Sequence, residues 1–154
     1  MKSLMMTVTL TGFLAQTVSA DPSCKPIHAV QRDVLVTEDC PSPIGFCAAG
    51  TIDGNHGLRG TTFYSSRGFH SVPGEAPTRQ VVVGTSTFTT ENGVITVEDL
   101  SVFDTVRGTF AGVAPIVEAT GRFAGATGDI LTVGRVLPDG SLITDVTGEL
   151  CLPE

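Results

Sequence analysis

The stretch Ala114–Ile130 constrains the fold of this chain more than any other segment. It reads APIVEATGRFAGATGDI and contains two Thr-Gly steps, Thr120-Gly121 and Thr127-Gly128, around an aromatic residue and several small ones. Glycines at this density permit positive φ angles and close approach of neighbouring backbone segments. They favour tight turns or barrel corners, and we expect Gly121 and Gly128 to be conformationally required.

Short runs rich in Val, Ile, Thr and Phe recur along the chain, and turn residues separate them. The eighteen glycines and nine prolines interrupt any long helical period, so the pattern indicates an all-β protein. Glu91-Asn92-Gly93 predicts a tight hairpin with a type I′ turn, and Asp139-Gly140 predicts another. The expected strands are His28–Glu38, Phe46–Ile52, Leu58–Ser66, Arg79–Thr90, Val94–Phe103, Arg107–Val117, Phe123–Leu137 and Ser141–Leu152, with a loop from Arg67 to Thr78.

This order of strands favours a single closed antiparallel eight-stranded meander β-barrel of the calycin-like kind. An open sheet of eight strands would expose two edges, and closure into a barrel removes them. Eight strands also enclose an interior that side chains fill or that holds one small ligand. A β-sandwich is the structural alternative. The barrel domain is expected over residues 21–154, which are enough for one hydrophobic core.

The first twenty residues have the features of a secretory signal peptide. Lys2 precedes the apolar run Leu4–Val18, and the small residues Ser19 and Ala20 precede Asp21. A membrane anchor is the alternative, but the apolar run is short for a membrane span. We therefore expect cleavage after Ala20, a secreted, extracellular protein, and no membrane span in the mature form.

The charge balance disfavours nucleic acid as a partner. Residues 21–154 contain sixteen acidic and eight basic residues, and the basic residues form no continuous stripe. Recognition of phosphates needs a basic face, so no nucleic-acid binding is expected. An acidic surface is typical of a soluble exported protein.

The four cysteines, an even number in a chain expected to be exported, predict two disulfides. Three pairings are open, and we favour Cys40–Cys47 across a short loop together with Cys24–Cys151 between the two ends of the domain. A reactive free cysteine is the less favoured interpretation. No CxxC pair occurs, and the three histidines lack the spacing of paired metal ligands, so neither a metal site nor a cofactor is expected.

The region from about Val81 to Val136 resembles the allene oxide cyclase and dirigent superfamily of β-barrels. The resemblance rests on Phe88-Thr89-Thr90 before a turn, on the strand that follows it, and on the two Thr-Gly steps of Ala114–Ile130. It implies a barrel that encloses a small hydrophobic molecule and that acts, where it is an enzyme, as a cofactor-free isomerase or cyclase. The sequence departs from the superfamily pattern at Glu118-Ala119.

The candidate catalytic residues are polar side chains within apolar strands, because the chain contains no hydrolase nucleophile motif and no phosphate-binding loop. Glu98 and Asp99 are neighbours on one expected strand, so only one of them can face the barrel interior. Burial there would raise the pKa of that carboxyl group and suit it to general acid chemistry. Tyr64 could donate a proton inside a cavity. The structural alternatives are a carboxylate paired with an arginine and a core tyrosine whose hydroxyl lies at the rim.

Four residues are candidates for ligand binding, namely Arg79, Phe88, Phe103 and Glu118. Arg79 could bind an anionic group or cap a loop, and Glu118 could lie at the barrel mouth or on the surface. Small side chains in the strands are expected to leave space between aromatic ones. The small residues are Gly84, Ser86, Ala124 and Ala126, and the aromatic residues are Phe88, Phe103, Phe110 and Phe123.

Two functions compete on this basis. The first is a secreted barrel that binds a small apolar molecule in its lumen, with isomerase or cyclase activity as its enzymatic form. The alternative is a non-enzymatic structural or protein-interaction barrel whose lumen is packed with side chains. The lumen discriminates between them, because fold alone does not set function.

Overall fold

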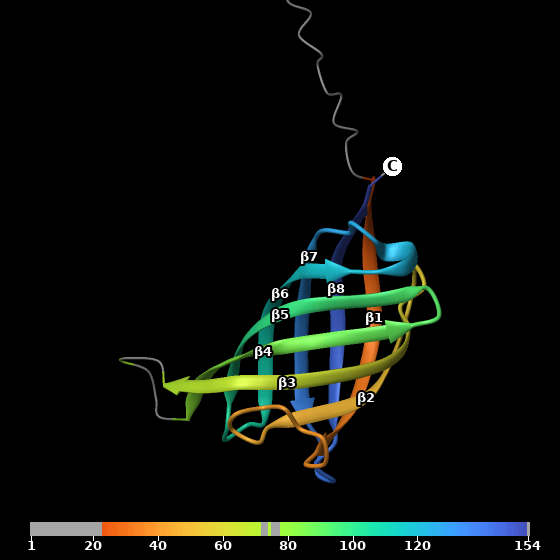
Figure 1. The fold of residues 1–154 in the computed structure, drawn as a ribbon. Coiled ribbons are helices and arrows are strands. Elements are labelled where there is room, and N and C mark those ends of the chain that lie inside the picture. The colour runs from red at the N-terminus through yellow and green to blue at the C-terminus, as the bar shows by residue number, and fades with distance from the viewer. Residues whose placement is uncertain (1–22, 72–73, 75–77, 154) are drawn as a thin grey trace, which may run out of the picture.

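Eight antiparallel strands in meander order form one closed barrel (Figure 1). This computed structural model describes residues 23–71, 74 and 78–153. The predicted all-β barrel is confirmed, and the predicted signal peptide lies outside the described residues. The elements are β1 (Ser23–Val36), β2 (Cys47–Gly54), β3 (Arg59–Ser71), β4 (Arg79–Thr90), β5 (Gly93–Asp104), β6 (Thr109–Ala119), the 3-10 helix η1 (Gly121–Phe123), β7 (Asp129–Val136) and β8 (Leu142–Leu152).

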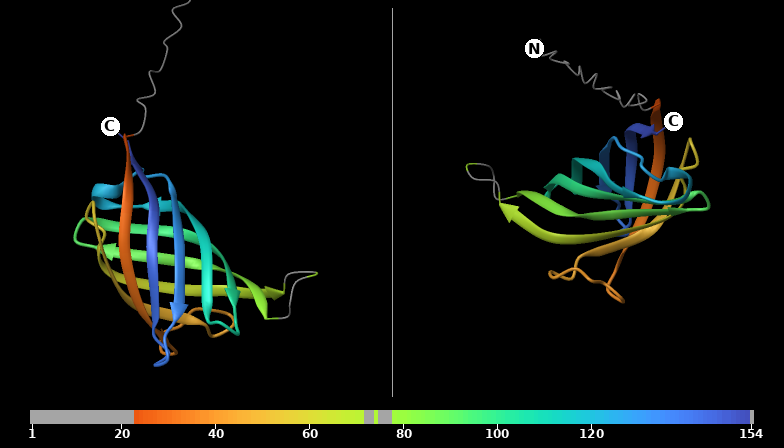
Figure 2. Two further views of the ribbon diagram at one scale, coloured as in Figure 1. Left: turned by 180° about the vertical axis from the view of Figure 1, so that it is seen from behind. Right: turned by 45° about the horizontal axis from the view of Figure 1, so that its top comes forward.

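The first and last strands meet at the seam that closes the barrel. β1 pairs with β8 over eleven residue pairs, beginning near Cys24 and Cys151, which lie directly opposite one another. Figure 2 shows the two strands side by side when the molecule is seen from behind. A disulfide joins Cys24 to Cys151, and a second joins Cys40 to Cys47, as predicted. Disulfides of this kind are typical of proteins from oxidising compartments.

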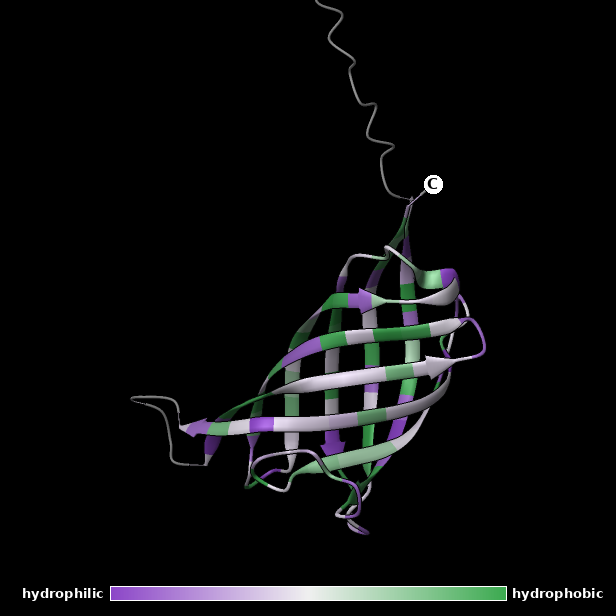
Figure 3. Cartoon of the chain, viewed as in Figure 1, coloured by the Kyte–Doolittle hydropathy of each residue, from purple (hydrophilic) through white to green (hydrophobic). Residues whose placement is uncertain are grey.

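Side chains alternate between the interior and the outer surface along each strand, because the strand period is two residues. Green and purple segments follow one another along the strands in Figure 3 for this reason. Phe123 of η1 is buried against the end of the barrel at which β1 begins and β8 ends, together with Ile27, Ile95 and Leu150. We call this the closed end. Among the described residues, no helix has the length and apolar character needed to cross a membrane.

Strand β3 continues beyond its predicted end at Ser66, so the first part of the predicted loop from Arg67 is wrong. A β-bulge lies between Ser66 and Gly68 in the pairing with β4. The bulge adds one residue to β3, which reverses the alternation of side chains beyond it. Phe69 therefore lines the barrel interior. His70, expected in the loop, lies instead within the strand.

The glycine-rich segment forms a turn that sequence reasoning placed inside a strand. The predicted strand Phe123–Leu137 is wrong in its first part, because β7 begins only at Asp129. Gly121 begins η1 with φ +62°, and Gly128 precedes β7 with φ +134°. Both glycines thus have the positive φ angles that their Thr-Gly context predicted.

The predicted hairpin between β4 and β5 is confirmed, but its type I′ turn is wrong. Thr90 pairs with Gly93, so Glu91 and Asn92 form the two-residue loop. Asn92 does not have the positive φ that a type I′ turn requires. The Thr90 hydroxyl instead accepts from the Asn92 N–H at 3.0 Å and donates to the Gly93 carbonyl oxygen at 3.0 Å.

Candidate functional site

A cavity of about 230 Å³ occupies the barrel lumen and opens at the end opposite η1. Its floor is apolar and consists of Phe88, Val97, Ala114 and Ile130, which belong to the core of the closed end. For comparison, a dry cavity of about 150 Å³ is large enough to bind benzene. The lumen therefore has room for a molecule of one or two rings.

Aromatic side chains surround the mouth of this cavity. Phe46 lies edge-to-face on Phe69, with ring centroids 5.3 Å apart, and on Tyr64 at 6.1 Å. On the other side of the mouth, Phe103 and Phe110 have centroids 6.5 Å apart. Aromatic rings supply a large contact area for apolar ligands, and their faces attract cations.

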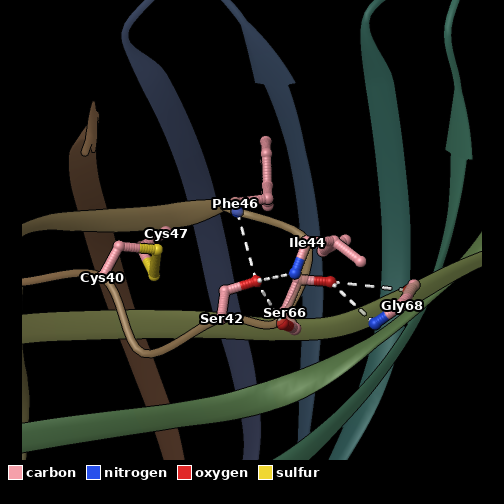
Figure 4. The surroundings of a disulfide bond; sticks show 7 residues. All are labelled: Cys40, Ser42, Ile44, Phe46, Cys47, Ser66 and Gly68. Carbon is pink, nitrogen blue, oxygen red and sulfur yellow. Dashed lines mark hydrogen bonds between the residues drawn. A yellow bond between two sulfur atoms is a disulfide. The ribbon is translucent and has the colours of Figure 1, made fainter.

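The connection between β1 and β2 holds Phe46 at the mouth (Figure 4). The Cys40–Cys47 disulfide closes this loop at its base. Within it, the buried Ser42 hydroxyl donates to the Ser66 carbonyl oxygen at 2.6 Å and accepts from the Phe46 N–H at 3.2 Å. The Ser66 N–H donates in turn to the Phe46 carbonyl oxygen at 3.0 Å. The main chain of Phe46 is thus held by two hydrogen bonds, in addition to the packing of its ring.

A layer of polar side chains crosses the lumen between the aromatic mouth and the apolar floor. Asp33 is buried in this layer and accepts hydrogen bonds from Gln31 Nε2 at 2.5 Å and from the Thr62 hydroxyl. Thr62 reaches Asp33 across β2 because Gly50, which pairs with both residues, has no side chain. Burial raises the pKa of Asp33, and the two hydrogen bonds offset part of that increase.

Asp99 is the second carboxyl group of the polar layer. Its Oδ1 accepts from the Ser101 hydroxyl, and no other hydrogen bond to this carboxylate exists within the described part of the chain. Burial raises the pKa of Asp99 against the opposing effect of Ser101. Burial and the nearby charge of Asp99 together raise the pKa of Tyr64 to about 12. The tyrosine is therefore protonated at neutral pH.

Two hydroxyl groups of the lumen are buried without a hydrogen-bond partner among the described residues, those of Tyr64 and Thr132. The neighbouring Ser66 side chain lies close enough to lower the pKa of Tyr64, but the acceptors of the Ser66 hydroxyl are the carbonyl oxygens of Val83 at 3.2 Å and Gly68 at 3.4 Å. Thr132 is 7 % exposed and lines the cavity. A buried hydroxyl without a partner costs about 1–3 kcal/mol, so both groups are destabilising unless a molecule in the cavity supplies a partner.

The structure separates the two neighbouring carboxylates in the way that strand alternation requires. Asp99 lines the cavity together with Tyr64 and two predicted ligand-binding residues, Phe88 and Phe103. Glu98 points outward, where it forms an ion pair with Arg67 and accepts from the Thr85 hydroxyl at 3.3 Å. Arg67 lowers the pKa of Glu98 through this bond.

The other two predicted ligand-binding residues, Arg79 and Glu118, are exposed and do not line the cavity. Arg79 begins β4, and Glu118 pairs with Thr96 on the outer face of β5 beside a bulge in β6. Neither therefore reaches the lumen as the barrel is folded.

Some of the small residues that were predicted to leave space inside the barrel do face its interior. Ser86 lines the cavity, and Gly84 faces the interior beneath the ring of Tyr64. Ala124 is exposed, whereas Ala126 and Phe123 are buried in the core of the closed end rather than at the cavity. Interior glycines of several strands let neighbouring side chains or backbone lie close against them, namely Gly50, Gly84, Gly112 and Gly134.

Sequence reasoning missed half of the polar layer. Asp33 and Gln31 lie on the same face of β1 as the buried Ile27 and Ala29. The alternation of buried and exposed residues along β1 was thus a usable signal, because it indicates that the Asp33 carboxylate faces the barrel interior. Phe69 carried no comparable signal, because its orientation depends on the bulge in β3.

The described residues bring together one group of potential metal ligands, Cys24, Cys151 and Glu149. Both cysteines are disulfide bonded, so they offer no thiolate. The chain matches no protein-family model, and no curated protein or solved structure is significantly similar to it.

Proposed function

We propose that this protein is an exported barrel that binds one small apolar molecule in its lumen, as its resemblance to the allene oxide cyclase and dirigent superfamily implies. The observation that carries the proposal is the open cavity of about 230 Å³ between the aromatic mouth and the apolar floor. The two disulfides are consistent with export.

Titration calorimetry with naphthalen-2-ylmethanol tests this proposal, because the compound combines a two-ring apolar body with one uncharged polar group. We expect saturable binding of one molecule per barrel. Ser86→Phe should abolish it by filling the lumen, whereas Thr87→Phe on the outer face of the same strand should leave it unchanged. If Ser86→Phe does not fold, Ser86→Leu is the smaller filling variant. Absence of binding to the unmodified protein, both of this compound and of naphthalene compounds with other polar groups, would refute the proposal.

Isomerase or cyclase chemistry is the enzymatic form of the same proposal. It is supported by Asp99 and Tyr64, two acidic groups that line the cavity and whose pKa values are raised by burial. Mass spectrometry of metabolite extracts incubated with the protein would detect conversion of one compound into an isomer. Asp99→Asn should stop that conversion while binding persists. An equal rate for the variant would exclude Asp99 as the acid.

The alternative function, contact with another protein through the outer face, is favoured by one observation. Leu100, Val113 and Leu131 pair across β5, β6 and β7 and are exposed. The open lumen weighs against the packed interior that this alternative supposes. The calorimetric titration separates the two functions, because a purely interacting barrel binds no ligand in its lumen.

A further inference from the structure

The polar groups of the lumen have only one sign of charge. Asp33 and Asp99 both line the cavity, and its described lining contains no Arg, Lys or His. A carboxylate or phosphate ligand would bring negative charge beside these two acidic groups, with no cation in the described lining to meet it. Anionic ligands are therefore disfavoured, since burial of an unpaired charge is costly.

The two carboxylates differ in what they can still bind. Both oxygens of Asp33 already accept hydrogen bonds, from Gln31 and Thr62. Among the described residues, Asp99 accepts only from Ser101 through Oδ1, so its Oδ2 is available to a donor in the cavity. Asp99 is thus the acceptor of the polar layer that a ligand can engage.

Unpartnered hydroxyls provide a second, independent observation. The Tyr64 and Thr132 hydroxyls are buried and make no hydrogen bond within the described residues. Gly112 pairs with Ser101 on one neighbouring strand and with Thr132 on the other. The Ser101 hydroxyl in turn donates a hydrogen bond to Asp99. A ligand group with several N–H donors could donate hydrogen bonds to the Asp99 carboxylate and to a hydroxyl oxygen at the same time.

We propose that the lumen is selective for small apolar molecules that carry a protonated amine. The ammonium group donates to Asp99 within the polar layer, and the apolar body lies toward the mouth among Phe46, Phe69, Phe103 and Phe110. This inference rests on the proposed function and adds the chemical class of the ligand. The aromatic mouth also attracts a cation on its way into the barrel, and the net negative charge of the protein favours its approach.

Three compounds with one naphthalene body and different polar groups test the inference by calorimetry at neutral pH. They are naphthalen-2-ylmethylamine, naphthalen-2-ylmethanol and naphthalene-2-carboxylic acid. We expect the amine to bind at least about tenfold more tightly than the alcohol, and the acid to bind most weakly. This ranking is measured on the unmodified protein, so it does not depend on whether any variant folds.

Variants then identify the group responsible for the selectivity. Asp99→Asn should weaken amine binding by about tenfold or more and change alcohol binding by less than about threefold. Glu98→Gln, the adjacent substitution on the outer face, should change neither. Equal affinity for amine and alcohol, tighter binding of the acid, or an unaltered amine affinity in Asp99→Asn would overturn the inference. Binding of the alcohol in those cases would leave the proposed function standing, whereas binding of none of the three would refute both.

Discussion

The ring of Tyr64 lies directly over Gly84 on the neighbouring strand. A Cβ atom built on Gly84 would be 2.6 Å from both Cε2 and Cζ of that ring. Gly84 also pairs with Asp99. The missing side chain on β4 is therefore what allows an aromatic ring from β3 to lie in the polar layer close to the Asp99 carboxylate.

Gly84→Ala should reduce both stability and ligand binding. The added methyl group overlaps the Tyr64 ring and the Ser65 carbonyl oxygen, and overpacking of this kind costs about 1–3 kcal/mol. Urea denaturation measures the loss, and calorimetry with naphthalen-2-ylmethanol measures the change in the lumen. Thr87→Ala, on the outer face of the same strand, should cost at most about 1 kcal/mol and leave binding intact. Equal effects of the two substitutions would contradict this account of Gly84.

Gly121→Ala should destabilise the barrel by more than the cost of placing an alanine at a positive φ angle. Its Cβ would collide with the Asn92 carbonyl oxygen, in addition to the strain of φ +62°. Gly45→Ala is a matched control, because Gly45 has φ +70° and open space around it. We expect a cost of about 1–2 kcal/mol for the control and a clearly larger one for Gly121→Ala and for Gly128→Ala, whose Cβ would meet the Glu149 carbonyl oxygen. Unfolding midpoints in urea provide the comparison, and equal midpoints would remove the steric argument.

The buried carboxyl groups should make the protein lose stability as the pH rises. Asp33 and Asp99 have pKa values raised by burial, so each binds its proton more tightly in the folded than in the unfolded state. Their stabilising contribution is complete below the unfolded pKa of about 3.9 and is lost as the pH rises through the folded value. The free energy of unfolding of Asp99→Asn should therefore fall less steeply above about pH 4 than that of the unmodified protein.

Glu98→Gln is the control of opposite sign. Arg67 lowers the pKa of Glu98, so the contribution of this pair is present above the unfolded pKa and is lost as the pH falls. Because the pair is exposed, the effect should be small. Unfolding curves of the two variants at several pH values give both slopes. A steeper decline for Asp99→Asn would show that Asp99 is not destabilised by burial.

The two disulfides should differ in their contribution to stability. Removal of Cys24–Cys151 by two alanine substitutions frees a loop with a sequence separation of 127, which corresponds to about 4–5 kcal/mol in the chain-entropy account. The Cys40–Cys47 bridge spans a separation of 7 and should contribute about 2–3 kcal/mol. Thiol titration of the unreduced, denatured protein should find no free thiol, and urea denaturation ranks the two double variants. The reverse order would show that the β1–β2 loop contributes more than its length suggests.

The sequence was most informative where side-chain alternation alone decides the outcome. Strand order, barrel closure and the inward position of only one of Glu98 and Asp99 follow from periodic patterns and from the cost of exposed sheet edges. The bulge in β3 and the 3-10 turn at η1 depend instead on pairing with distant strands, so local patterns assigned Phe69 to a loop and Phe123 to a strand. The candidate site was half predicted for the same reason. Alternation along β1 does place Asp33 inside the barrel, but its hydrogen bond from Thr62 across Gly50 depends on strand pairing.

The Cys24–Cys151 bond turns the chain between these residues into a covalent ring that passes once around the barrel. A protease that cut this ring once, for example in the exposed turn at Asp139-Gly140, would release no fragment. The nicked molecule would remain one covalent piece, with its eight strands still joined in sequence through the seam. Two cuts are needed before any strand can leave the molecule. The position of the Cys24–Cys151 disulfide at the barrel seam should therefore slow degradation where proteases are abundant.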